Sequence, residues 1–124
     1  MKITFLGSGH GVPQPGRRCT SMMVEVGERV YLIDGGTAVA DILINRWNSV
    51  MDKSAFTPIK AVFTTHKHSD HTFGLIELLC LATWYHTESS WVTHLTDERL
   101  KNAIVEVIEA SFSNNCYDHE RMPI

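Results

Sequence analysis

Three histidines and one aspartate lie within six consecutive positions near the middle of the chain, in the pattern His66-x-His68-x-Asp70-His71. They follow an apolar run that predicts a strand over residues 59–65. Imidazole and carboxylate groups are ligands for zinc and similar divalent metals. Because side chains alternate along a strand, the first three groups are expected on one side and His71 on the other. Two ligand pairs could then serve two adjacent ions that activate one water, which predicts a hydrolytic centre.

The same pattern resembles the metal-binding signature of the metallo-β-lactamase superfamily, His-x-His-x-Asp-His at the end of a strand, and it is complete here. Residues 1–13 are similar to the opening strand and glycine loop of the ribonuclease Z-like branch, and residues 30–36 to the strand before the first helix of that fold. The resemblance covers most of residues 1–83 and, more loosely, 91–110. It implies an α/β fold, the αββα sandwich, in which residues 1–124 form a single domain containing the N-terminal half and incomplete at the C-terminus.

For the site, the resemblance implies that His66 and His68 hold one divalent ion and that Asp70 and His71 hold a second. Zinc is favoured, with manganese or iron as alternatives. The resemblance also implies that Asp70 helps to move a proton to the leaving group. Asp34 ends a predicted strand before two glycines. It is either a turn aspartate or a carboxylate that orients a metal-bound histidine.

The motif supplies two ligands per ion, whereas zinc sites use three or four protein ligands. Three interpretations stay open. The chain is a truncated form of a metallo-hydrolase, or two copies assemble and complete a core, or it is a non-catalytic binding or assembly module that keeps the fold. We favour the first, with partial metal occupancy. The resemblance points to hydrolysis of phosphodiester bonds of the ribonuclease Z type, with nucleic acid as a possible substrate.

The remaining histidines are expected to lie in solvent or to serve structure: His10, His86, His94 and His119. In the glycine loop around His10, Ser8 and the neighbouring amides would form at most a weak anion nest. Asp118-His119 lacks the strand-end context of the central motif. Four aromatic side chains are expected in the core or a cleft wall, because their spacing does not suggest stacking on bases: Phe73, Trp84, Tyr85 and Trp91.

Composition gives a broader frame. The net charge of −3 argues against a strongly basic nucleic-acid surface, and Arg17-Arg18 is the only adjacent basic pair. Three cysteines without a Cys-x-x-Cys pair make a disulfide framework improbable, and they favour a reducing compartment. The start of the chain does not read as a signal peptide, and no apolar run approaches the roughly 20 residues that span a bilayer. A cytoplasmic protein without membrane contact is predicted.

The remaining patterns predict alternating strands and helices. Strands are expected at 2–6, 20–26, 29–34 and 91–95, the second and third joined by a tight turn at Gly27-Glu28. Helices are expected after Thr37 as cap, over about 74–83, and after Thr96 as cap to about residue 110. One sheet face would lack the second sheet of a sandwich, so the chain is expected to dimerise through it, to aggregate, or to need a missing C-terminal portion.

Overall fold

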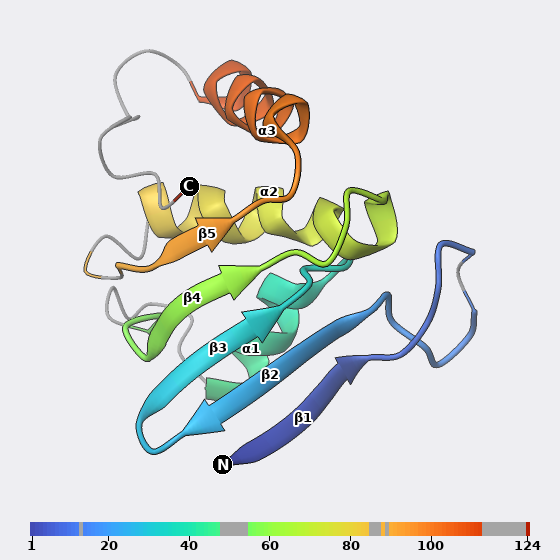
Figure 1. Cartoon of the computed structure of the whole chain (residues 1–124), viewed down its shortest axis with the longest axis vertical. Helices are drawn as coiled ribbons and strands as arrows, with labels where there is room; N and C mark the ends of the chain where they lie inside the picture. The colour runs from blue at the N-terminus through green and yellow to red at the C-terminus, as the bar shows by residue number, and fades with distance from the viewer. Residues whose placement is uncertain (13, 48–54, 85–87, 89, 113–123) are drawn as a thin grey trace.

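The computed structural model of the chain describes residues 1–12, 14–47, 55–84, 88, 90–112 and 124 (Figure 1). These residues contain five strands, which form one mixed sheet in sequence order. The first three pair antiparallel, and the last three pair parallel. The strands are β1 (Lys2–Gly7), β2 (Ser21–Val26), β3 (Arg29–Ile33), β4 (Ile59–Phe63) and β5 (Val92–His94). The predicted α/β class with a mixed sheet is confirmed.

The hairpin between β2 and β3 forms as predicted. Val26 pairs with Arg29 and leaves Gly27-Glu28 as the two-residue loop. Gly27 has a φ of +60°, a backbone conformation that glycine adopts without steric cost. The turn sets the register of the two strands and thereby the face on which each side chain of β2 and β3 lies.

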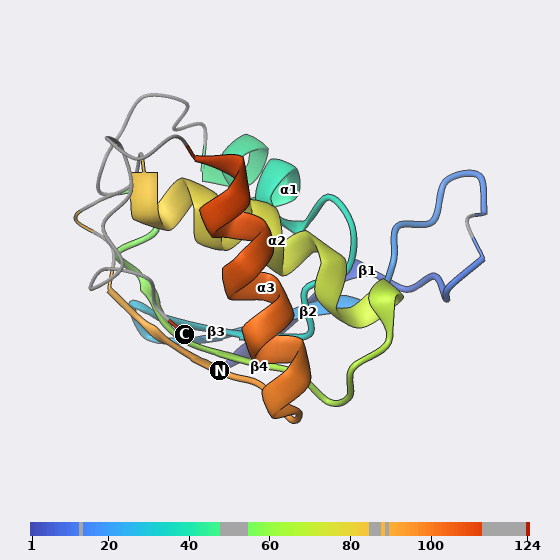
Figure 2. The ribbon, with the colours of Figure 1, turned by 90° about the horizontal axis from the view of Figure 1, so that it is seen from above.

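In the part of the chain that the structure describes, three helices follow the parallel strands, and all lie on the same face of the sheet (Figure 2). They are α1 (Val39–Trp47), α2 (Ser69–Trp84) and α3 (Glu98–Ser111). Two predicted caps were wrong. Asp97, not Thr96, caps α3, with its carboxylate accepting from the amides of Arg99 and Leu100. The Thr37 hydroxyl instead lies 3.0 Å from the Cys19 sulfur, and α1 begins two residues later.

The core lies between the sheet and this layer of helices. Met23, Leu32 and Val62 are fully buried on the helix-facing side of the sheet. They belong to one apolar cluster with side chains from all three helices: Leu43, Leu75, Leu79, Ile104 and Ile108. Among the described residues, no helix is both long and apolar enough to cross a membrane.

Among the described residues, no helix lies over the opposite face of the sheet (Figure 2), and this face carries exposed apolar side chains. The strand registers place Ile3 and Phe5 of β1 on the same side as the half-buried Val24 and Met22 of β2. Five large apolar side chains of the strands are between 41% and 71% exposed: Ile3, Phe5, Val26, Phe63 and Val92. We call this surface the open face. The described residues therefore form one sheet and one helix layer of the predicted sandwich.

Candidate metal centre

The histidine motif spans the connection between β4 and α2 and the first turn of α2. It lies at the carboxyl ends of the parallel strands, where α/β sheets commonly bind ligands. The strand ends at Phe63, so the predicted strand over 59–65 is two residues too long. The His68 carbonyl accepts from the His71 amide at 3.0 Å as α2 begins at Ser69. The alternation argument was therefore wrong, because a bend and a helical turn, rather than a strand, position the motif.

Asp70 and His71 form the first of two side-chain pairs. His71 Nδ1 lies 2.7 Å from Oδ2 of Asp34, whose side chain is only 4% exposed. An ionised carboxylate only accepts hydrogen bonds, so Nδ1 donates and the lone pair of the neutral ring is on Nε2. That Nε2 lies 3.4 Å from Asp70 Oδ2. Two acceptors then face each other, and a proton or a metal cation between them removes the repulsion.

His66 and His68 form the second pair, and Asp34 governs it through Thr65. The Thr65 amide donates to Asp34 Oδ1 at 2.7 Å, and the Thr65 hydroxyl lies 2.8 Å from Oδ2. Because the hydroxyl gives its single hydrogen to the carboxylate, it must accept from His66 Nδ1, which is 3.0 Å away. The free nitrogen of His66 is then Nε2, which lies 3.1 Å from His68 Nδ1.

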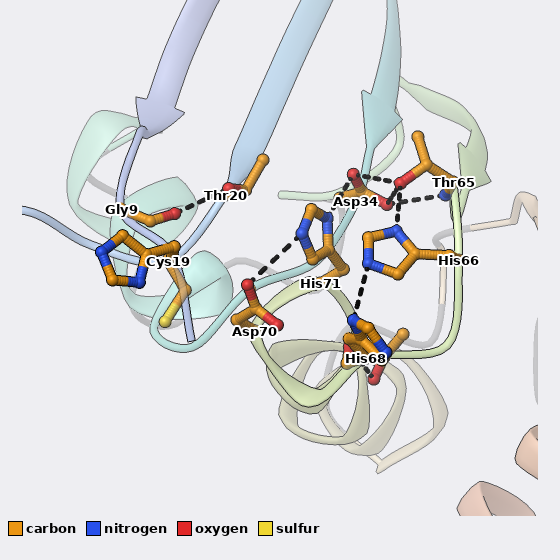
Figure 3. Close-up of polar contacts among 12 residues, drawn as sticks. Gly9, Cys19, Thr20, Asp34, Thr65, His66, His68, Asp70 and His71 are labelled. Carbon is orange, nitrogen blue, oxygen red and sulfur yellow. Dashed lines mark hydrogen bonds and ion pairs between the residues drawn. The ribbon is translucent and has the colours of Figure 1, made fainter. Parts of the chain in front are cut away.

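The donor set fits divalent metal ions. Zinc–nitrogen bonds of about 2.0–2.1 Å place two nitrogens about 3.3 Å apart at a tetrahedral ion, close to the 3.1 Å between His66 Nε2 and His68 Nδ1. The rings of His66 and His71 have centroids 4.1 Å apart, so the two pairs adjoin (Figure 3). Among the described residues, no three or more His, Cys, Asp or Glu side chains converge as ligands of a metal ion. Each pair thus offers two donors.

Close backbone packing holds the carboxylate in place. Asp34 has a φ of +60°, a conformation that aspartate tolerates better than most residues. The next residue, Gly35, donates to the His71 carbonyl at 2.7 Å and accepts from the Gly74 amide at 2.8 Å. A Cβ on Gly74 would overlap the carbonyl oxygen of Gly36. Glycine at 74 therefore lets α2 approach the loop closely enough for His71 to reach Asp34.

Several other predicted residues lie away from the motif or have other contacts. His10 is exposed, and its Nδ1 accepts from the Val12 amide at 3.3 Å. His94 stacks on Phe63, with ring centroids 4.7 Å apart. Trp91 is buried, as expected for a core residue. Trp84 is half exposed. The remaining candidates lie outside the described residues: Tyr85, His86, Cys116, Asp118 and His119.

Two residues near the motif were missed by sequence reasoning. Thr65 directly precedes His66, and only the bend after β4 shows that its hydroxyl connects Asp34 to that histidine. A hydroxyl residue at a strand end beside a histidine was the available signal. Cys19 lies beside Asp70, on the side away from His66 and His68 (Figure 3). It comes from the far end of the glycine loop, so no local pattern could have placed it there.

Comparison with known proteins shows the family to which the chain belongs. The model of one protein family, described as "Anti-Pycsar protein Apyc1", matches residues 1–120. The chain belongs to this family. It also resembles, in sequence, Ribonuclease Z from Picrophilus torridus, with 40% identity over 78 residues, which are 63% of this chain and 23% of that protein. The chain thus spans about a quarter of the length of this curated relative.

Solved structures agree on the fold of this Apyc1-family chain. Human tRNase Z, short form, superposes with a TM-score of 0.66 at 27% identity, over 90% of this chain and 40% of that one. The metallo-beta-lactamase fold protein YhfI from Bacillus subtilis superposes with a TM-score of 0.62 at 18% identity, over 93% of this chain and 42% of that one. Zn(2+)-bound PqqB from Methylobacterium extorquens superposes with a TM-score of 0.57 at 22% identity, over 88% of this chain and 43% of that one. The chain has the metallo-β-lactamase fold and corresponds to a part of each of these longer proteins. PqqB is the one of the three whose structure is described as zinc-bound.

Proposed function

We propose that this chain contributes half of a dinuclear metal centre that hydrolyses phosphodiester bonds. The observation that carries the proposal is the role of Asp34. This buried carboxylate bonds directly to Nδ1 of His71, and it is linked through Thr65 to Nδ1 of His66. In both rings Nε2 is therefore the free nitrogen. Carboxylates that fix the tautomer of metal-binding histidines in this way are a common feature of metal sites. A solvated polar loop would not need such an arrangement.

In the proposed site His66 and His68 hold one ion, and Asp70 and His71 hold the other. Zinc suits this set of nitrogen and carboxylate donors, and manganese or iron are the alternatives. When bound, such ions polarise the bond under attack and make a water nucleophilic near neutral pH. Asp70 has a second role in the proposal. Its side chain is only 13% exposed and lies next to His71, where it can pass a proton toward the leaving oxygen.

The substrate class rests on the relatives. The ribonuclease name of the curated relative reported above supports a phosphodiester substrate, in RNA or in a smaller nucleotide. The second candidate is a binding or assembly module that keeps the fold without catalysis. The observation in its favour is that each side-chain pair offers two donors, so an ion held by the described residues alone has coordination positions left over. We propose that further ligands come from outside the described residues.

A graft tests the proposal. The 78 residues of Picrophilus torridus Ribonuclease Z that match this chain would be replaced by the corresponding residues of this chain. Bis-p-nitrophenyl phosphate, a cyclic nucleotide and an RNA are then supplied with zinc or manganese. We expect hydrolysis by the graft, and its loss in the Asp70→Ala variant. The 124-residue chain alone should turn over bis-p-nitrophenyl phosphate poorly, because catalysis needs a fully ligated centre.

The outcomes separate the two candidates. A folded graft that binds metal but hydrolyses none of the three substrates would favour the binding module. Hydrolysis that survives Asp70→Ala would place the chemistry elsewhere. Strong turnover by the isolated chain would show that the chain itself supplies the remaining ligands.

A further inference from the structure

A small hollow lies next to Asp70, on the side away from the His66–His68 pair. Its volume is about 120 Å³, and the residues that line it come from the glycine loop, the start of α1 and the start of α2. They are Gly11, Cys19, Thr37, Ser69, Asp70 and Phe73. Figure 3 shows Cys19 on this side of Asp70. Asp70 therefore separates this hollow from the two histidines and belongs to both sites.

Phe73 forms one wall of the hollow and is unusually exposed for its position. It follows Asp70 by three residues on α2, so the two side chains project from neighbouring points of the helix surface. Its side chain is 58% exposed, although Thr72, Gly74 and Leu75 around it are buried. The ring is therefore not needed to fill the core. An exposed aromatic face beside the proposed catalytic carboxylate is suited to contact a flat ligand group.

The rest of the lining is polar and open. The Thr37 hydroxyl lies 3.0 Å from the Cys19 sulfur and retains lone pairs that can accept hydrogen bonds. The side chain of Ser69 is exposed at the rim. The absence of a side chain at Gly11 keeps the hollow accessible, since an added Cβ would lie 3.6 Å from the Asp70 carboxyl carbon. That distance is ordinary van der Waals contact, so a methyl group there would narrow the hollow without a clash.

We propose that this hollow is a nucleobase subsite, in which the base next to the scissile phosphodiester stacks on Phe73 and its polar edge meets the hydroxyls of Thr37 and Ser69. A nucleobase has the required combination of a flat π-face and a polar edge, which a bare sugar phosphate lacks. The inference rests on the proposed function, because Asp70 would place the scissile bond. The spacing of the aromatic residues in the sequence does not suggest base stacking. The exposure of Phe73 in the structure does suggest it.

Binding measurements on the zinc-supplied chain test the subsite. Adenosine 5′-monophosphate and ribose 5-phosphate share the sugar and the phosphate and differ only in the base. We expect NMR titrations to show tighter binding of the nucleotide by about 10- to 100-fold, the usual value of one base–aromatic stack. Phe73→Ala should bring this ratio close to one, whereas Phe73→Trp should keep it. Gly11→Ala should lower the ratio by narrowing the hollow.

The ratio separates this inference from the proposed function. His66→Ala with His68→Ala should weaken both ligands by a similar factor, because the phosphate loses its metal and the base contact remains. A ratio near one in the unaltered chain, or a ratio that Phe73→Ala leaves unchanged, would overturn the nucleobase subsite. The same is true if no binding of the nucleotide is seen at millimolar concentration. The proposed function would fail separately, through a graft whose hydrolysis does not depend on Asp70.

Discussion

Asp70 and His71 lie in the first turn of α2, whereas His66 and His68 lie in the bend that precedes it. His71 is 16% exposed and bonds directly to Asp34, which is part of a closely packed loop. His68 is exposed, and its ring contacts the ring of His66. The Asp70–His71 pair is thus held by packing and by a direct bond to Asp34. In the other pair, His66 is linked to Asp34 through Thr65, and the exposed His68 contacts His66.

This difference separates two requirements of a metal centre. A ligand fixed by packing loses little freedom when an ion binds, whereas an exposed side chain loses rotamer freedom at that moment. Stability and metal affinity should therefore respond differently to substitutions in the two pairs. Asp34 is the exception, because it acts on both.

Asp34→Ala should have the largest effect of all. It removes a buried acceptor of bonds from Thr65 and His71, and hydrogen bonds to charged groups contribute about 1.5–3 kcal/mol each. We expect a loss of about 3 kcal/mol in the free energy of unfolding and a loss of zinc affinity of about 10- to 100-fold. Chemical denaturation and zinc titration measure the two. Asp34→Asn is the matched control, since it keeps the shape but not the charge. A change below about 1 kcal/mol in Asp34→Ala would mean that this is only a turn residue.

Replacing one histidine from each pair tests directly whether the two pairs differ in how they contribute to stability. His71→Ala should cost about 1–2 kcal/mol of stability, because it leaves a buried carboxylate without one of its donors. His68→Ala should change stability by less than about 0.5 kcal/mol, as exposed substitutions usually do. Elemental analysis should show less bound zinc in both variants. Equal stability changes would remove the distinction between the pairs.

Thr65→Val should weaken metal binding with a smaller effect on folding. Valine has a similar shape but cannot relay the hydrogen bond from Asp34 to His66. We expect zinc affinity to fall by about tenfold and stability to fall by about 1 kcal/mol. Thr65→Ser keeps the hydroxyl and should restore most of the affinity. If serine and valine behave alike, the hydroxyl does not set the orientation of His66.

The smallest effect is expected at an ion pair between the bend and the N-cap of α3. Lys67 Nζ lies 3.2 Å from Asp97 Oδ2. The pKa of Asp97 is lowered from its ordinary value of 3.8, mainly by the hydrogen bond from the Leu100 amide and, to a smaller extent, by Lys67. The folded pKa lies below the unfolded one, so the stabilisation is present above about 3.8 and is lost as the pH falls through the folded value. Lys67→Met should give a slight destabilisation near neutral pH that disappears in acid, measured by thermal unfolding across pH. A loss that persists in acid would point to packing of the lysine stem.

Sequence patterns predicted most of the fold because its signals are local. Alternation in β2, the Gly27-Glu28 turn and the apolar stripe of α3 each depend on a few neighbouring residues. The start of α2 was placed too late, at about residue 74 instead of Ser69, because polar residues of the motif fill its first turn. The cap of α3 was misplaced by one residue, since Thr96 and Asp97 are both good caps and only the backbone distinguishes them.

The site was less accessible to this reasoning. The four ligand residues could be named from their spacing, but their arrangement as two pairs depends on where β4 ends. The link from Asp34 to Thr65 joins residues 31 positions apart through the parallel pairing of β3 and β4. The approach of Cys19 to Asp70 depends on the path of the glycine loop. Such contacts arise only after the sheet has formed, and no local periodicity encodes them.

We expect copies of the chain to associate through the open face, so every measurement proposed above should depend on protein concentration. Ile3, Phe5 and Val92 expose apolar area that water covers in a single copy and that a second copy can cover instead. Association of this kind follows mass action, so the thermal midpoint should rise as the chain is concentrated. Light scattering should show masses above 14.0 kDa at high concentration, and replacing Phe5 by serine should shift them downward. Affinities for zinc and nucleotides can then be compared between variants only at matched protein concentration, where each sample has the same balance of single and associated copies.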